Sequence, residues 1–417
     1  MRILFLSHYF PPEVNAPATR TLEHCVRWVA AGHEVIVVTC NPNCPDGVLF
    51  PGHRNRWRRQ TDEVHGIRLL RVWTYLAPNA GFVRRILNYV SYMIAATWTC
   101  LWIKRPDIVV ATSPQFFCGW AGVLVSKLRR TPLVLEIRDI WPESIVAVGA
   151  MRKGILLRLL ETMEKWMYRA ADHVVAVGNG YRDNIMQKVD LGDRCTVITN
   201  GVDVGSFQAV ETEESLDEQW NLFGRFTCFY IGTIGMAHGL QVVIRAAKLL
   251  QAKGRQDICF CIVGDGAQRM TLEQETIQAG MQDVVIFTGR VSNDRIPSLL
   301  RRADACLVHL RKTDLFSTVI PSKIFETMAM QCPIIMGVEG EALRIVTEAQ
   351  AAIPMTPESA EELTVAVERL ADEAQLQQQL GENGRRYVAE HFDRNRLAAK
   401  YLELLEEVSG KPGSIKE

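Results

Sequence analysis

The chain has 417 residues, of which 48% are apolar and 23% charged, and its 47 Lys and Arg balance its 47 Asp and Glu. Such a length predicts two or three domains with large cores, and the composition excludes a disordered chain, a collagen-like fibre and a multi-span membrane protein. The zero net charge argues against nucleic acid as a partner, yet it conceals a net charge of +9 over residues 1–200 (25 basic against 16 acidic) and −9 over residues 201–417.

This charge asymmetry indicates two domains with different partners, or merely two differently charged domain surfaces. Short runs rich in Val, Ile and Leu alternate with helical stretches in both halves, which is typical of parallel sheets covered on both faces. We predict strands at Ile3–Ser7, Glu34–Thr39, Ile67–Val72, Ile108–Thr112, Leu133–Ile137, His173–Val177 and Thr196–Ile198, and then at Cys228–Ile231, Ile258–Val263, Val284–Thr288, Ala305–Leu310 and Pro333–Met336.

The pattern therefore predicts an α/β protein with two Rossmann-like domains. We place the first at residues 1–199 and the second at 200–389, because the boundary falls near Asn200-Gly201, ahead of an acidic stretch from Glu211 to Glu218. The chain is helical from about Glu361, and we expect residues 390–417 to pack back on the first domain.

Residues 86–103, ILNYVSYMIAATWTCLWI, form an uncharged segment flanked by Arg84-Arg85 and Lys104-Arg105. Its length is at the lower limit for a membrane span, but Asn, Ser and Thr side chains dilute its hydrophobicity. We interpret it as a helix that lies in the membrane interface or packs on the sheet, with a true span as the third alternative.

The eleven cysteines include no C-x-x-C pair, so neither a zinc site nor thioredoxin-like chemistry is supported. Buried free thiols in a reducing cytoplasm fit best. The apolar run Met1–Leu6 is too short for a signal peptide and is expected to be the first strand.

In an open α/β sheet, ligands bind outside the carboxyl ends of the strands, so the following loops are the candidate sites. The loop after the first strand contains the candidate residues Asn15, Ala16 and Pro17. The small Ala16 and Ala18 permit close approach of a ligand, and Arg20 can reach a phosphate at a helix start. The alternative is a structural loop.

A second candidate site is the Arg138-Asp139 pair, which follows the fifth predicted strand. Asp139 can orient or deprotonate a hydroxyl. The alternative is that the pair only fixes the loop.

In the second half, Gly232 and Gly235 free the backbone of the loop after Cys228–Ile231, so that its N–H groups can face a pyrophosphate. Pro321 suits the first turn of a helix, where Ser322 and Lys323 can converge on a phosphate. Glu326, one turn beyond Ser322, can accept hydrogen bonds from both hydroxyls of a ribose. The alternative is an ordinary capped helix with a surface Lys–Glu pair.

These segments together resemble the family 4 glycosyltransferases. The resemblance rests on five segments in this order: GHEVIVVT (Gly32–Thr39), TNGVD (Thr199–Asp203), YIGTIGMAHGL (Tyr230–Leu240), IVGDG (Ile262–Gly266) and PSKIFETMAM (Pro321–Met330). The segment LEIRDIWPES (Leu135–Ser144) makes the chain similar to the subgroup that acts in bacterial exopolysaccharide and O-antigen assembly. It implies the GT-B fold, in which a cleft between two Rossmann-like domains holds a nucleotide sugar.

The resemblance also implies a function. It predicts retaining transfer of a hexosyl or N-acetylhexosaminyl group from a nucleotide diphospho-sugar, with UDP as the expected nucleotide. The expected acceptor is a polyprenyl-diphosphate-linked saccharide at the cytoplasmic membrane face. No metal or other cofactor is expected, since Lys323 and helix termini neutralise the leaving diphosphate. Asn200 and Arg290 join the donor site, Arg290 beside the nucleobase, with Glu326 on the ribose.

This sequence departs from the family pattern at several positions. Thr318 stands where the family usually has the first of two glutamates, and His238 stands in the glycine loop that usually carries Arg and Lys. Arg138 replaces a histidine found in many members, which makes Asp139 the candidate for handling the acceptor hydroxyl. A UDP-sugar 2-epimerase on the same fold, or a non-catalytic sugar-nucleotide-binding partner subunit, are the alternative functions.

Overall fold

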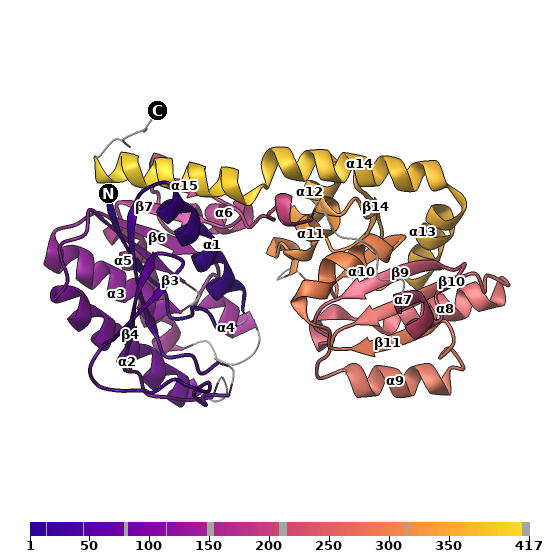
Figure 1. The fold of residues 1–417 in the computed structure, drawn as a ribbon, viewed down its shortest axis with the longest axis horizontal. Helices are drawn as coiled ribbons and strands as arrows, with labels where there is room; N and C mark the ends of the chain where they lie inside the picture. Colours follow the sequence, from indigo (N-terminus) through magenta and orange to yellow (C-terminus); the bar gives the residue numbers. More distant parts are fainter. Residues whose placement is uncertain are drawn as a thin grey trace. The chain divides into compact units, whose positions relative to one another are not determined.

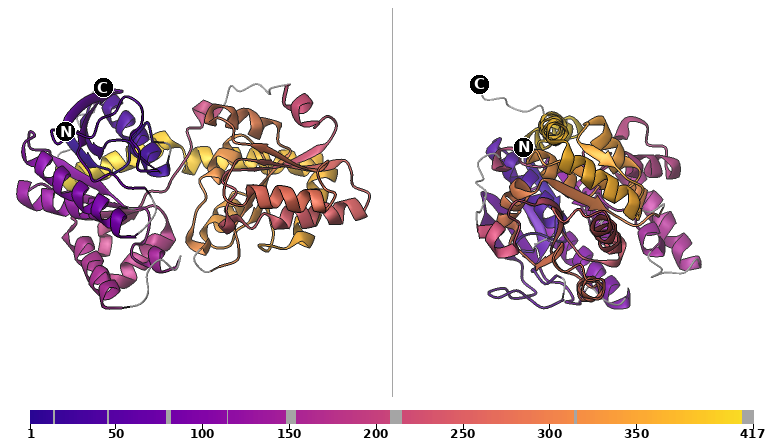
Figure 2. Two further views of the ribbon diagram at one scale, coloured as in Figure 1. Left: turned by 90° about the horizontal axis from the view of Figure 1, so that it is seen from below. Right: turned by 90° about the vertical axis from the view of Figure 1, so that its right-hand side faces the viewer.

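The computed structural model describes residues 1–13, 15–44, 46–78, 82–113, 115–147, 154–207, 215–313 and 316–410. The chain divides into two compact units (Figure 1). Unit 1 comprises Met1–Asn200 and Arg394–Glu417, and unit 2 comprises Gly201–Asp393. In each unit, helices cover both faces of a central sheet (Figure 2).

The sheet of unit 1 has eight strands in the order β3-β4-β2-β1-β5-β6-β7-β8. All neighbours pair in parallel except β3 and β4, which form an antiparallel hairpin at one edge. The strands are β1 (Arg2–Leu6), β2 (Glu34–Cys40), β3 (Gln60–Val64), β4 (Ile67–Val72), β5 (Ile108–Thr112), β6 (Leu133–Ile137), β7 (His173–Ala176) and β8 (Cys195–Val197).

The helices of unit 1 are α1 (Ala16–Ala30), α2 (Phe82–Leu101), α3 (Phe116–Arg129), α4 (Glu143–Ala147), α5 (Ile155–Ala170), α6 (Asn179–Lys188) and α15 (Arg394–Ser409). Buried side chains of α2, α3 and α5 form one core with the sheet. Trp28 of α1 and Tyr401 of α15 belong to a second core on the opposite face, where the Trp28 indole donates a hydrogen bond to the Ala398 carbonyl at 3.1 Å. The C-terminal helix therefore packs on the N-terminal part of the chain.

The sheet of unit 2 has six parallel strands in the order β11-β10-β9-β12-β13-β14. Its strands are β9 (Phe226–Ile231), β10 (Ile258–Val263), β11 (Val285–Gly289), β12 (Ala305–His309), β13 (Ile334–Gly337) and β14 (Ala352–Pro354). Its helices are α7 (Ser215–Trp220), α8 (Gln241–Ala252), α9 (Arg269–Gln278), α10 (Ile296–Arg302), α11 (Lys323–Ala329), α12 (Glu341–Glu348), α13 (Ala360–Asp372) and α14 (Ala374–His391).

Every strand that we predicted is present, which confirms the two parallel α/β sheets. Sequence analysis missed β3, because the edge strand QTDEV is polar and largely exposed, and β14, which has three residues. The acidic stretch ahead of α7 lies mostly outside the described residues. All eleven cysteines are free thiols, and only Cys44 and Cys195 are not fully buried.

The uncharged segment forms most of α2. Tyr92, Ala96 and Cys100 on one side are buried in the core, whereas Ile94 and Trp98 on the other side are more than 60% exposed. Among the described residues, no helix has both the length and the apolarity needed to cross a bilayer. The prediction that this helix packs on the sheet is therefore confirmed for one of its faces.

Candidate functional site

A cavity lies at the point in unit 2 where the strand order reverses. There β9 and β12 run side by side at the centre of the sheet, and ligands of open α/β sheets bind outside the carboxyl ends of such strands. The cavity has a volume of about 450 Å³, which is in the range of small-molecule sites. It is lined by Phe207, Ile231, Gly232, Thr233, His238, Ile296, Leu300, Cys306, Pro321, Ser322, Lys323, Glu326 and Thr327.

Lys323, the first residue of α11, brings a cation to this cavity. Its Nζ atom is shielded from solvent and has no hydrogen-bond partner in the part of the chain that the structure describes. The atom lies 4.1 Å from the centroid of the Tyr230 ring, a cation–π contact. Burial lowers the pKa of Lys323 to about 8, against the opposing effects of Cys306 and Glu326. A shielded ammonium of this kind is costly until an anion approaches it.

The glycine loop after β9 makes room for this ammonium. Gly232 has φ +144°, and a Cβ atom at this position would lie 3.1 Å from Lys323 Nζ. A Cβ atom at Gly264, in the loop after β10, would lie 1.9 Å from the Gly232 carbonyl oxygen. Glycine at 264 therefore lets the two loops pack against each other, and glycine at 232 lets the first loop adopt its positive φ beside the ammonium.

His238 offers the cavity a neutral hydrogen-bond donor. Burial, and secondarily the charge of Lys323, lower its pKa to about 4. The Gly235 N–H points at Nδ1 from 3.4 Å, so the proton of the neutral ring belongs on Nε2. The buried His309 holds this loop, because its Nδ1 donates to the His238 carbonyl at 2.6 Å while its Nε2 accepts from the Glu358 N–H at 2.8 Å.

The segment before α11 carries the other predicted donor residues. Pro321 and Ser322 line the cavity but precede the helix, which begins at Lys323, so the prediction that Pro321 lies in its first turn is wrong by two residues. Glu326 also lines the cavity. Thr318 ends a short 3-10 turn, Phe316–Thr318, and is not one of the lining residues.

Arg290 lines a second cavity of about 360 Å³ at the same edge of the sheet. It follows β11 and is exposed. The two cavities share Ile231, Gly232, Thr233 and Ile296, so they are adjacent. Unit 2 thus brings all the predicted donor residues except Gly235 and Asn200 to these two cavities. Gly235 lines neither cavity but contacts His238 through its N–H.

Asn200 and Arg20 lie together in unit 1, and their packing argues against the predicted ligand contacts. The Arg20 side chain is 6% exposed and pairs with the fully buried Glu136 at 3.1 Å. Its Nη1 donates to the Thr199 carbonyl at 2.6 Å and to Asn200 Oδ1 at 3.2 Å, and its Nη2 donates to the Ile198 carbonyl at 2.8 Å. Arg20 therefore ties α1 to the end of β8, which is the structural alternative for this loop.

Asn15, Ala16 and Pro17 form the start of α1. The Asn15 side chain caps the helix by accepting a hydrogen bond from the Ala18 N–H at 2.9 Å. Pro17 occupies the first turn, where its missing N–H costs nothing. Ala16 is exposed. The capping role explains Asn15 without a ligand.

The loop after β6 has the properties of an acid–base site. Burial raises the pKa of Asp139, and the Ser144 hydroxyl, which donates to Oδ2 at 2.9 Å, opposes that shift. Burial lowers the pKa of Arg138 to about 10, which Glu136 opposes. Two nitrogens of Arg138 are shielded and have no partner in the described parts of the chain. Asp139 and Arg138 are thus adjacent polar groups at the carboxyl edge of the sheet.

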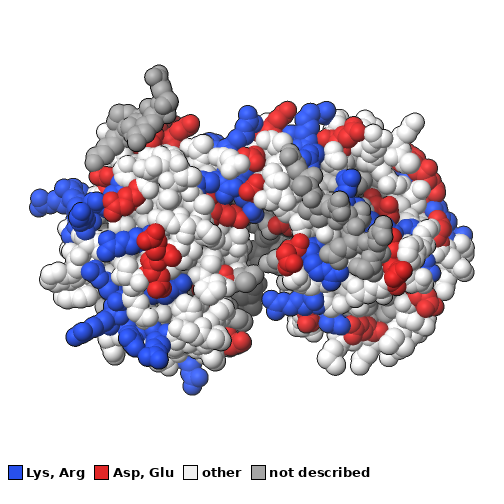
Figure 3. Space-filling model, viewed as in Figure 1, with Lys and Arg blue, Asp and Glu red and all other residues white. Residues whose placement is uncertain are grey.

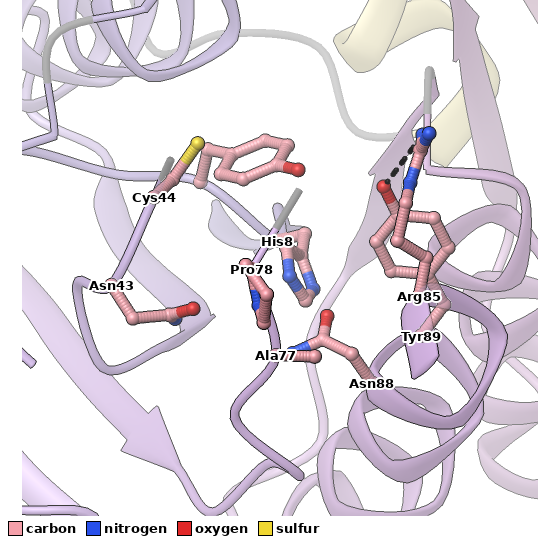
Figure 4. Close-up of a pocket in the computed structure, with 9 residues that line it drawn as sticks. His8, Asn43, Cys44, Ala77, Pro78, Arg85, Asn88 and Tyr89 are labelled. Carbon is pink, nitrogen blue, oxygen red and sulfur yellow. Dashed lines mark hydrogen bonds between the residues drawn. The ribbon is translucent and has the colours of Figure 1, made fainter. Parts of the chain in front are cut away.

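Sequence analysis missed a small polar pocket around His8, directly after β1 (Figure 4). Burial lowers the pKa of His8 to about 3, and its Nδ1 lies 3.3 Å from the Gln115 amide nitrogen. The rings of Tyr9, Tyr89 and Tyr92 contact the imidazole edge to face. The cavity of about 20 Å³ holds no more than a water-sized group. A histidine directly after a buried strand was the available signal.

Comparison with known proteins identifies the family. Residues 15–201 match the family model described as "Glycosyl transferase 4-like domain", and residues 213–387 match "Glycosyl transferases group 1". The chain is 27% identical over 342 residues to the "Putative colanic acid biosynthesis glycosyl transferase WcaI" of Escherichia coli (strain K12), covering 79% of this chain and 81% of that one. It is 26% identical over 305 residues to the alpha-D-kanosaminyltransferase of Streptomyces kanamyceticus, with 69% and 76% covered.

Solved structures show the same fold. Anabaena HepE in complex with UDP and glucose matches with a TM-score of 0.69 at 18% identity, over 97% of this chain and 99% of that one. WaaG, a glycosyltransferase involved in lipopolysaccharide biosynthesis, matches with a TM-score of 0.65 at 16% identity, over 97% and 99%. The two family models together span most of the chain. The chain belongs to the family 4 glycosyltransferases and has their GT-B fold.

Proposed function

We propose that this glycosyltransferase moves a hexosyl or N-acetylhexosaminyl group, with retention of configuration, from a uridine diphospho-sugar to a saccharide on polyprenyl diphosphate. The observation that carries the donor half is the shielded, unpartnered Lys323 ammonium in a cavity that Glu326 also lines. UDP as the nucleotide is supported by solved structures with the same fold, in which Anabaena HepE is in complex with UDP or UDP-glucose.

In this proposal each donor group contacts one part of the nucleotide sugar. Glu326 accepts hydrogen bonds from the ribose hydroxyls, and Arg290 lies beside the base in the adjacent cavity. Lys323 and the Nε2–H of His238 contact the diphosphate, together with backbone groups at Gly232. These groups supply the charge that a metal ion provides in other transferases, so we expect activity without an added metal.

The chemical step breaks the bond between the anomeric carbon and the diphosphate oxygen. The acceptor hydroxyl oxygen bonds to the same face of that carbon, and its proton passes to an oxygen of the departing diphosphate or to Asp139. Lys323 offsets the negative charge that develops on the diphosphate. The raised pKa of Asp139 makes its carboxylate a stronger proton acceptor than an ordinary aspartate.

The acceptor half of the proposal concerns unit 1 and the cytoplasmic membrane surface. Val83, Leu87, Ile94 and Trp98 on the outer side of α2, and Trp102 just beyond it, are each at least 50% exposed. Their spacing places them in one stripe along the helix. An exposed apolar stripe of this length is typical of helices that lie in a membrane interface, where a polyprenyl-linked acceptor resides.

Thermal shift with a panel of nucleotides and nucleotide sugars tests the donor site, because a ligand that binds the folded state raises its melting temperature. We expect UDP and a UDP-sugar to give the largest shifts, and no shift with any nucleotide would overturn the proposal. Hydrolysis or transfer of the UDP-sugar should be abolished in Glu326→Ala but retained in Glu382→Ala, a matched change on the exposed side of α14.

Two outcomes would assign a different function. A nucleotide-induced rise in melting temperature without turnover on any lipid-linked acceptor would favour the non-catalytic subunit. The motivation for this alternative is Thr318, which stands in place of the usual glutamate. Recovery of the UDP-sugar with its C2 configuration inverted would instead identify an epimerase.

A further inference from the structure

The connection between β2 and β3 carries a dense cluster of positive charge. Arg54, Arg56, Arg58 and Arg59 are all exposed, and so is Trp57, of which 80% is accessible. None of these four guanidinium groups forms a salt bridge with a carboxylate anywhere in the described residues. Four unpaired like charges this close in sequence repel one another, and an extended anionic surface would relieve that repulsion.

Ring stacking fixes the position of Trp57, the tryptophan in this cluster. The Trp57 ring stacks on the ring of Trp73, just after β4, with centroids 4.0 Å apart and planes 13° from parallel. The stacked pair exposes amphipathic indole surface to solvent. Tryptophan is enriched where a membrane meets water for this reason.

Hydrogen bonds connect this loop to α2. The Asn55 amide donates to the Thr74 carbonyl at 2.6 Å, and the Thr74 N–H donates back to Asn55 Oδ1 at 3.2 Å. At the next residue, the Tyr75 carbonyl accepts from the Asn88 amide of α2 at 2.6 Å, and its N–H donates to Ser91 Oγ at 2.8 Å. The arginine loop is therefore fixed, through Thr74 and Tyr75, against the first half of α2.

The start of α2 extends the same combination of charge and apolar area. Arg84 is exposed beside Val83, and the apolar stripe of α2 runs on from there. Lys and Arg side chains gather over the lower part of unit 1, where α2 lies (Figures 1 and 3). Basic side chains next to exposed aromatic and aliphatic groups match an anionic bilayer, whose headgroups attract the charges while the interface accepts the rings.

We propose that residues 54–59, the Trp57–Trp73 stack and the exposed face of α2 together dock unit 1 on an anionic phospholipid bilayer. The proposal extends the proposed function, which requires a membrane-borne acceptor, and gives it a specific lipid chemistry. A nucleic acid would satisfy the arginines but would leave the apolar stripe of α2 in water, so the bilayer fits more of the surface.

Co-sedimentation of the full chain with vesicles tests this surface. One set of vesicles contains phosphatidylcholine and phosphatidylglycerol at about 3:1, and the other contains phosphatidylcholine alone. A basic residue near an anionic surface contributes a factor of about five to binding, so changing all four arginines to Gln should weaken binding to the anionic vesicles by about 100-fold or more. Binding to phosphatidylcholine should hardly change, and added salt should remove the difference between the two sets.

A matched pair of double variants separates this surface from general charge. Arg58→Gln/Arg59→Gln should weaken binding to anionic vesicles, whereas Arg396→Gln/Lys400→Gln on α15, which packs on the opposite face of the sheet, should not. Trp57→Ser should weaken binding to both vesicle types, because the ring contributes apolar area rather than charge.

Several results would overturn the proposal. Unchanged vesicle binding by the four-arginine variant would limit any anchor to α2, and equal losses in the two double variants would reduce the effect to net charge. A loss of binding to a short DNA duplex without a loss on vesicles would assign the surface to nucleic acid. The UDP-induced rise in melting temperature tests only the donor site in unit 2. If that rise is retained while vesicle binding fails, the docking surface is rejected and the donor site is not.

Discussion

Replacing Lys323 with Met is expected to stabilise the unliganded protein and to weaken nucleotide binding at the same time. Met has a similar length and no charge, so it can occupy the shielded place beside Tyr230. The two effects have opposite signs because the free protein bears the cost of a buried ammonium, and the bound diphosphate is the group that would compensate for it.

The magnitude follows from the titration of the lysine. Its pKa is lowered from 10.5 to about 8, which corresponds to a cost of about 3 kcal/mol for keeping the ammonium in the folded protein. The cation–π contact with Tyr230 offsets about 0.5–2 kcal/mol of that cost. The Met variant should therefore gain about 1–3 kcal/mol, which corresponds to about 2–12 °C in the melting temperature of a unit of this size.

The same titration fixes the sign of the pH dependence. The folded pKa lies below the unfolded one, so the cost is complete below about pH 8 and disappears as the pH approaches 10.5. The stability advantage of Lys323→Met should shrink over that interval. Affinity of the wild-type protein for UDP should fall as the pH rises above about 8, where the ammonium loses its proton, and the Met variant should show no such fall.

Differential scanning fluorimetry at several pH values gives the stabilities, and isothermal titration calorimetry gives the affinity for UDP. Loss of one charged hydrogen bond, about 1.5–3 kcal/mol, predicts a Kd that is about 10–150 times higher in Lys323→Met. Lys248→Met, on the exposed side of α8, is the control and should change neither quantity. A Met variant that melts lower than the wild type, or that binds UDP with the same Kd, would refute the assignment of Lys323 to the diphosphate.

Three further changes test individual contacts. Glu326→Gln should raise the Kd for UDP about 10–100-fold but leave the weak binding of pyrophosphate unchanged, because pyrophosphate has no ribose; calorimetry with both ligands distinguishes these cases. Ser144→Ala removes the hydroxyl that opposes the raised pKa of Asp139, so the acid limb of the pH–activity profile should move to higher pH. His309→Asn keeps an N–H where Nδ1 donates to the His238 carbonyl and should bind UDP nearly as the wild type does, whereas His309→Gln loses that donor and should bind about fivefold more weakly.

The sheets were predictable because their signal is local. A parallel strand buried on both faces is a continuous apolar run, and the runs at β1, β9 and β10 are plain in the sequence. The edge strand β3 has no such apolar run, because it is held by backbone pairing with β4 rather than by buried apolar side chains. The donor loops were also predictable, because glycines and a Ser-Lys pair after buried strands are local patterns whose position the fold determines.

Arg20 and Lys323 show where local reasoning ends. Both follow buried strands, and both were predicted to meet a phosphate. The difference between them arises from tertiary contacts. Glu136 and the carbonyls at the end of β8, more than a hundred positions away in the sequence, accept hydrogen bonds from the nitrogens of Arg20, whereas Tyr230 and Cys306 lie near the Lys323 ammonium without offering it a hydrogen bond. A buried cation whose donors are satisfied stabilises the fold, whereas a buried ammonium without any hydrogen-bond partner is a candidate for binding an anion. That distinction depends on tertiary pairing, so it follows from the structure and not from the order of the residues.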